Sequence, residues 1–140
     1  MNTLINSKGI TILELMVTLA IVAILASAAI PSYQNYSMRG NRSDGIESIH
    51  AILSAQERYY ADNMTYADSL TKLGMGSTSY TTPKGYYKIT VEKCGAMPYT
   101  QCVQLVATPP QGNSQEKDGI LIFNTTGKQV KKLGSTEVDL

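Results

Sequence analysis

The sequence predicts an α+β protein in which one long N-terminal helix packs, by its second half, on a small antiparallel sheet of three to four strands. Three observations lead to this prediction. An apolar run extends from Ile10 to Ile30 and contains a single ionisable side chain, Glu14. Apolar residues at helical spacing follow it, and after Gly85 apolar and polar residues alternate as they do in strands. A chain of 140 residues has room for one such domain.

The apolar run is long enough to cross a bilayer. Its 21 residues would span about 31 Å as a helix, close to the roughly 30 Å of a hydrocarbon core. The polar residues before Gly9 include Lys8, and the positive-inside rule places such a basic start in the cytoplasm. The remainder of the chain is therefore predicted to lie outside the cytoplasm.

Two simpler interpretations of this run are a secretory signal peptide and a plain membrane anchor. Ala26-Ser27-Ala28 offers a small-x-small cleavage site, and length and hydropathy suit an anchor. Glu14 argues against both, because a carboxylate within a membrane span costs about 2.5 to 3.5 kcal/mol and indicates a functional role.

The segment from Lys8 to Tyr33, KGITILELMVTLAIVAILASAAIPSY, resembles the N-terminus of type IV pilins and related pseudopilins. The resemblance implies that a prepilin peptidase cuts after Gly9 and methylates the new N-terminal residue, Ile10, where the family usually has Phe or Met. It also implies three parts, namely a leader peptide at 1–9, a transmembrane and polymerisation helix at 10–31, and a periplasmic globular domain at 32–140.

Glu14 is the candidate assembly residue. Cleavage creates a positive α-amine at Ile10, which in a low-dielectric surrounding favours a nearby carboxylate, and Glu14 is the only one on this segment. The resemblance implies that Glu14 pairs with the amine of a neighbouring subunit in a filament. Pairing with the amine of its own chain, four residues away, is the alternative.

The helix is predicted to continue to about Asp62. Pro31 lacks an N–H group and is predicted to kink or locally melt it, and the resemblance implies a proline there. Gly40 and Gly45 are predicted to loosen it further. The second half then presents an apolar stripe to the sheet, made by Ile46, Ile49, Ile52, Leu53, Tyr59 and Tyr60.

Short strands are predicted after a loop that extends from Asp62 to Gly85. Val130 is expected to point inward from a short edge strand. The predicted strands are Tyr87–Val91, Val103–Thr108, Ile120–Phe123 and Lys128–Lys131.

The two cysteines, Cys94 and Cys102, close the ends of the predicted hairpin between the first two strands. Outside the cytoplasm such a pair forms a disulfide, and closing so short a loop contributes roughly 2 to 3 kcal/mol. A redox pair is the alternative, but the Cys-x-x-Cys spacing and a neighbouring His are missing.

A second resemblance, to minor pilins of the PilE type, extends over about half of the chain. It rests on Arg39, on Arg42, and on the segments YQNY at 33–36, QERYY at 56–60 and LGM at 73–75. It implies a structural subunit of a type IV pilus, held in the inner membrane until incorporation, whose partners are other pilin subunits, the prepilin peptidase and the pilus assembly platform. The pilus would serve motility, adhesion or DNA uptake.

Two other functions are considered. A pseudopilin of a type II secretion system shares the N-terminus and would need carboxylates for Ca²⁺, of which the C-terminal third has four: Glu116, Asp118, Glu137 and Asp139. A DNA-binding minor pilin would use a small basic patch made by Lys128, Lys131 and Lys132, with Lys117 as a possible addition. A solvated sheet edge explains the same lysines.

The remaining function classes find little support. A formal net charge of +1 is too small for general polyanion binding. His50, the single histidine, has no ligand partners at metal-binding spacing and is predicted to be a surface or boundary residue. The sequence contains no catalytic motif, so we expect no enzyme activity, no metal and no cofactor.

Overall fold

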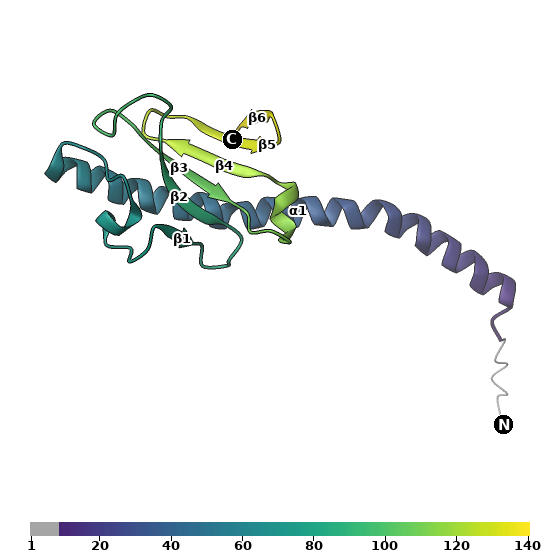
Figure 1. The fold of residues 1–140 in the computed structure, drawn as a ribbon. Helices are drawn as coiled ribbons and strands as arrows, with labels where there is room; N and C mark the ends of the chain where they lie inside the picture. The colour runs from purple at the N-terminus through teal and green to yellow at the C-terminus, as the bar shows by residue number, and fades with distance from the viewer. Residues whose placement is uncertain (1–8) are drawn as a thin grey trace, which may run out of the picture. The chain divides into compact units, whose positions relative to one another are not determined.

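The computed structural model describes residues 9–140, and the chain divides into two compact units. Unit 1 ends at Tyr36 and unit 2 comprises Ser37–Leu140. One helix, α1 (Ile12–Asn63), runs through both units, and unit 2 adds a six-stranded antiparallel sheet (Figure 1). The predicted α+β class is confirmed. Lys8, on which the predicted orientation in the membrane depends, lies outside the described residues.

α1 begins where its first turn is capped. The Thr11 hydroxyl oxygen accepts the backbone N–H of Glu14 at 3.2 Å, and the Thr11 carbonyl accepts the N–H of Leu15 at 3.1 Å, which together make Thr11 an N-cap residue. The following 19 residues, 12–30, contain neither Gly nor Pro. Pro31 lies inside α1 and does not end it.

α1 remains helical through Gly40 and Gly45, where the sequence predicts loosening. Gly45 is buried, and a Cβ atom added to it would lie 2.8 Å from Tyr87 Cδ2 and 2.9 Å from Leu121 Cδ1. At Gly40 nothing lies within 4 Å of such an atom. Gly45 therefore allows the helix to lie close to the sheet. The packing gained in this way offsets the lower helix propensity of glycine.

The six strands follow one another across the sheet in chain order. They are β1 (Ser79–Thr81), β2 (Lys88–Lys93), β3 (Val103–Thr108), β4 (Ile120–Asn124), β5 (Gln129–Leu133) and β6 (Thr136–Asp139). The sequence predicts β2 to β5 and misses β1 and β6, because neither contains a buried residue and their apolar alternation is correspondingly weak. The predicted edge strand, β5, is therefore flanked on both sides.

The hydrophobic core lies between α1 and one face of the sheet. The predicted apolar stripe reaches it through Ile49 and Ile52, which are fully buried, while Ile46 and Leu53 are partly buried against it. Because side chains alternate along a strand, every second strand residue faces the helix. The other core members are Leu70, Tyr87, Ile89, Leu105, Ala107, Leu121 and Phe123.

A second, smaller apolar cluster lies on the opposite face of the sheet. Val106, Ile122 and Val130 are cross-strand neighbours and are each at most 9% exposed. Val106 stands between Leu105 and Ala107 in β3, which face the helix, so its side chain points the other way. Val130 is thus buried as predicted, but on the face away from α1.

Gln56 ties the segment after α1 to the helix. Its side-chain oxygen accepts the N–H of Ala67 at 2.8 Å and its amide donates to the Ala67 carbonyl at 3.0 Å. Both residues are fully buried, so these two bonds satisfy polar groups that water does not reach. The short helix η1 (Leu70–Leu73) then places Leu70 in the core.

The connection from β3 to β4 returns to the helix. Asn113 caps the short helix η2 (Ser114–Lys117) by accepting the N–H of Gln115 at 3.0 Å. Gly119 follows with φ +95°, and a Cβ atom there would lie 2.3 Å from the carbonyl oxygen of Lys132. Glycine is required at this position, and it lets β4 begin beside β5 directly after Asp118.

Candidate functional site

The Gly9–Ile10 bond lies in an exposed, non-helical segment before α1. Ile10 is 79% exposed, and Gly9 has open space around its α-carbon. A protease needs an accessible backbone outside regular secondary structure, and both conditions hold here. The cap residue Thr11 follows immediately, so a cut after Gly9 would leave the start of the helix intact.

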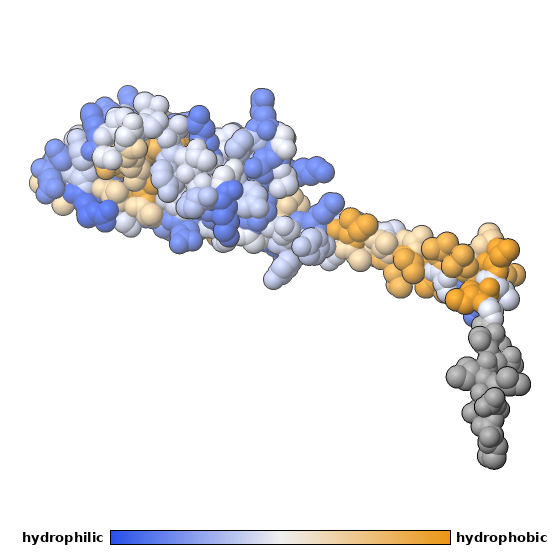
Figure 2. All heavy atoms as spheres, turned by 90° about the horizontal axis from the view of Figure 1, so that it is seen from below, coloured by the Kyte–Doolittle hydropathy of each residue, from blue (hydrophilic) through white to orange (hydrophobic). Residues whose placement is uncertain are grey.

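Unit 1 exposes apolar side chains around its helix. The large apolar residues between Ile12 and Leu25 are 50% to 81% exposed, and α1 is long and apolar enough to span a membrane by length and composition. In Figure 2 this part of the helix is mostly orange, with a few paler polar residues between the apolar ones. An apolar surface of this kind in water indicates a membrane or another protein as its natural surrounding.

Glu14 is the exception within this apolar surface. The Thr18 hydroxyl donates a hydrogen bond to the Leu15 carbonyl at 2.8 Å. In the same way the Ser27 hydroxyl donates to the Ile24 carbonyl at 2.7 Å, so both hydroxyl groups have hydrogen-bond partners within the helix. The Glu14 carboxylate has no hydrogen-bond or ion-pair partner among residues 9–140. It lies in the first turn, where the helix dipole favours a negative charge.

A buried ionic cluster joins α1 to the sheet in unit 2. Arg42 on α1 donates to both carboxylate oxygens of Asp118, from Nε at 2.7 Å and from Nη2. Lys131 on β5 lies 3.3 Å from the same carboxylate, and the Tyr87 hydroxyl donates to it at 3.3 Å. Asp118 is only 4% exposed, so one buried carboxylate is shared by two cations and a phenol.

The pKa of the Asp118 carboxyl reflects these neighbours. Burial alone would raise it, but the hydrogen bond and charge of Arg42, followed by those of Lys131, outweigh burial and hold the pKa below its ordinary value. For Tyr87 burial dominates and raises the pKa to about 12. Asp118 is therefore ionised and Tyr87 protonated at neutral pH.

Gln115 completes the attachment of the helix. Its side-chain amide donates to the Met38 carbonyl at 3.0 Å and to the Tyr87 hydroxyl at 3.1 Å. Gln115 is fully buried and its Oε1 atom has no partner among the described residues. The geometry of the ionic cluster holds the first turns of α1 in unit 2 against η2, β5 and the residue before β2, Tyr87.

The disulfide predicted between Cys94 and Cys102 is confirmed. The loop it closes contacts the segment after α1, because the Tyr66 N–H donates to the Tyr99 carbonyl at 2.9 Å. The ammonium of Lys93 lies 5.7 Å from the centre of the Tyr99 ring. The disulfide therefore supports a contact with the end of the helical region in addition to closing a hairpin.

Of the three lysines of the predicted basic patch, Lys131 lies apart from Lys128 and Lys132. Lys128 forms an ion pair with Glu137 at 2.7 Å. Lys131 faces the helix side and pairs with Asp118, whereas Lys132, the next residue along β5, faces the opposite side of the sheet beside Ile120. Lys132 forms no ion pair among residues 9–140, but it stands opposite Glu137 in the β5–β6 pair, beside the carboxylate that Lys128 binds.

His50 is exposed and packs edge-on against the Phe123 ring, with ring centres 5.6 Å apart. This agrees with the prediction of a surface or boundary residue. Residues 9–140 contain no group of three or more His, Cys, Asp and Glu side chains that could hold a metal ion.

Two protein-family models match this chain. Residues 4–30 match the model of the prokaryotic N-terminal methylation motif. Residues 31–119 match the model described as "Type IV minor pilin ComP, DNA uptake sequence receptor", which covers well over half of the chain. The chain belongs to the ComP family of type IV minor pilins. The predicted membership of the type IV pilins is confirmed.

Several type IV pilins are similar to this minor pilin. A fimbrial protein of Neisseria meningitidis serogroup A is 40% identical over 92 residues, which are 66% of this chain and 52% of that protein. The type IV major pilin PilE of Neisseria gonorrhoeae is 38% identical over 92 residues, 66% and 54% of the two chains. PilA of Myxococcus xanthus is 31% identical over 69 residues, 49% and 31% of the two chains. The chain spans about half the length of the first two relatives and less of the third.

Sequence reasoning missed two features of this minor pilin. Thr11 and Glu14 match the T-x-x-E pattern of a helix N-terminus, a signal that the sequence does contain. The cluster of Asp118, Arg42 and Tyr87 joins residues up to 76 positions apart. No local pattern predicts such pairing.

Proposed function

We propose that the chain is a structural subunit of a type IV pilus that a prepilin peptidase cuts between Gly9 and Ile10. The bond is exposed and precedes the helix, and the N-terminal methylation motif includes it. Ile10, the new first residue, would receive the methyl group. The proposed parts are a leader at 1–9, a membrane and polymerisation helix at 10–31 and a periplasmic domain at 32–140.

The observation that carries this proposal is the Glu14 carboxylate, which has no partner among residues 9–140 and lies in an exposed apolar helix. After cleavage the chain offers an ammonium group at Ile10 and a carboxylate one turn later, both in surroundings of low dielectric constant. When such helices pack side by side, the carboxylate of one and the amine of the next neutralise each other. The apolar side chains then provide the adhesion.

Before assembly the same helix would hold the protein in the inner membrane with unit 2 in the periplasm. Pro31, just past the apolar run, is the proposed place where the helix bends as it leaves the bilayer. Other pilins and the assembly platform are the proposed partners. A pseudopilin of type II secretion would share this anchoring, but the ComP family match favours the pilus.

The intact mass of the protein purified from its own membrane tests the cleavage site. We expect a chain that starts at Ile10 and carries one additional methyl group. A chain that starts at Ala29, as a signal peptidase product would, contradicts the proposal. A Gly9→Val variant is the matched control, since it should retain the leader and remain unmethylated.

DNA uptake is the second proposed function, and the family match is the observation that favours it. Among the three lysines of the predicted patch, Lys132 is the best DNA contact because it faces away from α1 and forms no ion pair among residues 9–140; its cross-strand neighbour Glu137 is bound by Lys128. Lys131 is bound to Asp118 and Lys128 to Glu137. A phosphate would have to displace these carboxylates to bind either lysine.

Fluorescence anisotropy of a labelled duplex tests this function with the full chain in detergent. Lys132→Gln should weaken binding and reduce the salt dependence by about one released counterion, and Lys128→Gln should change it less. If the wild-type protein does not bind the duplex, or binds it equally after Lys132→Gln, the assignment of Lys132 is refuted.

A further inference from the structure

Four exposed cationic side chains belong to segments that meet at the end of unit 2 where α1 enters it. We call them the basic cluster: Arg39, Lys84, Lys88 and Lys117. Arg39 follows Met38, whose carbonyl accepts the amide of Gln115 at 3.0 Å. Gln115 and Lys117 belong to the same short helix, η2, so η2 lies against the first helical turn of unit 2.

The turn between β1 and β2 reaches the same end. The Lys84 N–H contacts Oδ1 of Asp44 on α1 at 3.4 Å, and Asn113, the cap of η2, donates to the Gly85 carbonyl at 3.4 Å. Lys88 is the first residue of β2 and pairs with Thr108, the last residue of β3, from which the chain continues to η2. The two lysines therefore lie beside η2 and the start of α1 in unit 2.

The positive charge of this cluster is not neutralised locally. No member forms an ion pair within residues 9–140. The nearby carboxylates of Asp44 and Asp118 are buried, and Asp118 is already bound by Arg42 and Lys131. The exposed carboxylates of these segments are Glu116 and Glu47, which follows Asp44 by one helical turn, so four exposed positive charges face two negative charges.

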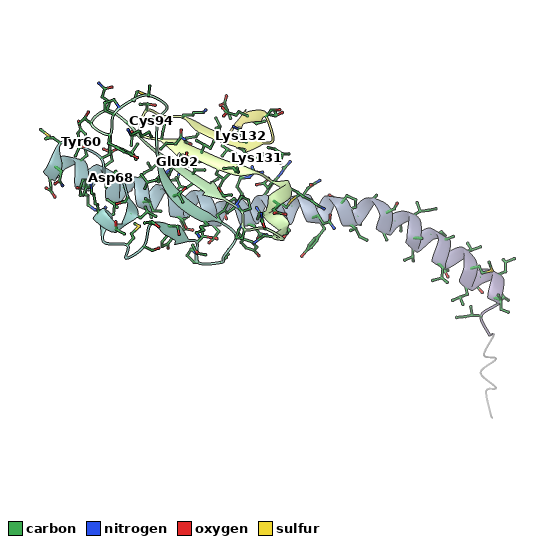
Figure 3. The ribbon with its side chains drawn as sticks, viewed as in Figure 1. Tyr60, Asp68, Glu92, Cys94, Lys131 and Lys132 are labelled. Atoms are coloured by element: carbon green, nitrogen blue, oxygen red, sulfur yellow. A yellow bond between two sulfur atoms is a disulfide. The ribbon has the colours of Figure 1, made fainter. Side chains whose placement is uncertain are left out.

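The other end of unit 2 differs in charge balance. Figure 3 labels Tyr60, Asp68 and Cys94 at this end, where α1 finishes. Its carboxylates outnumber its cations, and two cations are paired: Lys72 with Asp68 at 2.8 Å and Lys128 with Glu137 at 2.7 Å. The cations are Arg58, Lys72, Lys93 and Lys128, and the carboxylates are Glu57, Asp62, Asp68, Glu92 and Glu137.

Chain length keeps the basic cluster close to any membrane that α1 spans. Seven residues lead from Ile30, the last of the apolar run, to Ser37, the first of unit 2. Because α1 is helical through these residues, they rise only about 10 Å along the helix, and Arg39 follows two residues later. The start of the cluster therefore lies about one Debye length, roughly 8–10 Å, beyond the apolar run and close to the headgroup layer.

We propose that the basic cluster binds the headgroups of anionic phospholipids in the leaflet from which α1 emerges. The proposal rests on the membrane-anchored stage of the proposed function. Each Lys or Arg near an anionic surface strengthens binding roughly five-fold, and four together hold unit 2 at the membrane surface. This contact orients the subunit beside the bilayer before its incorporation and is broken when the subunit is extracted.

Energy transfer from a tryptophan to labelled headgroups tests the proposal. The chain contains no Trp, so Gln111→Trp, in the exposed loop before η2, gives a single donor near the basic cluster. The full chain is placed in nanodiscs of phosphatidylcholine with or without phosphatidylglycerol, with a dansyl-labelled lipid as acceptor. We expect stronger transfer with phosphatidylglycerol, and loss of the increase at about 0.5 M salt.

Two variants of equal charge change provide the control. Replacing all four cluster residues, as Arg39→Gln, Lys84→Gln, Lys88→Gln and Lys117→Gln, should abolish the increase. Replacing the four cations of the other end by Gln, at Arg58, Lys72, Lys93 and Lys128, should leave it unchanged. A second donor at the exposed Ala96, introduced as Ala96→Trp in the disulfide loop, should respond less than Gln111→Trp.

The alternative results distinguish failure of the membrane anchor from failure of the lipid-binding proposal. Failure of the chain to co-elute with nanodiscs contradicts the membrane anchor itself. Co-elution with equal transfer in both lipids, or an equal loss in the two quadruple variants, contradicts the lipid surface alone. Binding of a DNA duplex of about 20 base pairs that requires the basic cluster, together with equal transfer in both lipids, assigns the cluster to nucleic acid and overturns the proposal.

Discussion

Arg42 and Asp118 lie 76 positions apart in the sequence and form a two-pronged ion pair between α1 and the loop before β4. Their side chains are 18% and 5% exposed. Lys131 and Tyr87 share the carboxylate, so the pair is the centre of a network that connects the helix to three parts of the sheet region. It explains how the first turns of α1 in unit 2 are held against the sheet.

Asp118→Asn should destabilise unit 2 by roughly 2–3 kcal/mol, because it leaves Arg42 and Lys131 without their counter-charge in a buried place. Thermal unfolding of the full chain in detergent, followed by circular dichroism, measures this. Asp68→Asn, which removes the exposed partner of Lys72, is the matched control and should leave the midpoint nearly unchanged. Equal midpoints for wild type and Asp118→Asn would contradict the role of the network.

The Asp118 network should also make stability depend on pH. The pKa of this carboxyl is lowered in the folded protein, mainly because Arg42 and Lys131 outweigh the effect of burial. Its stabilisation is then complete above the unfolded pKa of about 4 and is lost as the pH falls through the lower folded value. The difference in unfolding midpoint between wild type and Asp118→Asn should shrink as the pH falls below about 5, and a constant difference would refute this assignment.

Substitution by alanine should lower the stability of the protein at Gly45 and raise it at Gly40. A Cβ atom at position 45 would meet Tyr87 and Leu121 at 2.8 and 2.9 Å, so Gly45→Ala should cost about 1–3 kcal/mol. Gly40 has open space in the same helix, and Gly40→Ala should stabilise by about 0.5–1 kcal/mol. Denaturant titration compares the two. A stabilising effect of Gly45→Ala would show that the helix and sheet are less closely packed than described.

Reduction of the disulfide should loosen the loop 95–101 and the segment that it contacts. Closing so short a loop contributes about 2–3 kcal/mol through the unfolded state. Hydrogen exchange of the Cys94→Ser, Cys102→Ser double variant should increase at Tyr66, whose N–H bonds to Tyr99, and remain unchanged at Ala107 in the central strand β3. Unchanged exchange at Tyr66 would mean that the loop is held without the disulfide.

The sequence contained enough to predict the helix, the central strands and the disulfide, because each depends on local periodicity or on cysteine spacing. Ile49 and Ile52 belong to an apolar stripe at helical spacing, and Ile89 and Leu105 belong to segments in which apolar and polar residues alternate as in strands. β6 has no buried residue and lacked such a signal. Its presence, in turn, makes β5 an internal strand.

Among the candidate sites, too, those that depend on a local sequence pattern could be predicted, and those that depend on the folded arrangement could not. Glu14 stands out in any reading of the sequence, since it interrupts an apolar run. Lys131 and Lys132 are separated because they occupy opposite faces of β5. The partners of Asp118 are distant in the sequence and come together only in the folded chain. Charges that a sequence places side by side are thus divided between two faces of the sheet.

The central claim is that the Glu14 carboxylate mediates assembly. The most direct measurement is the amount of this protein in pili sheared from cells that produce wild type, Glu14→Leu or Thr18→Val. Thr18 bonds only to its own helix, so Thr18→Val removes a polar group from the same segment without removing a carboxylate. We expect the protein to be absent from pili only in the Glu14→Leu strain, while its membrane level is unchanged. Equal incorporation of Glu14→Leu and wild type would contradict the claim.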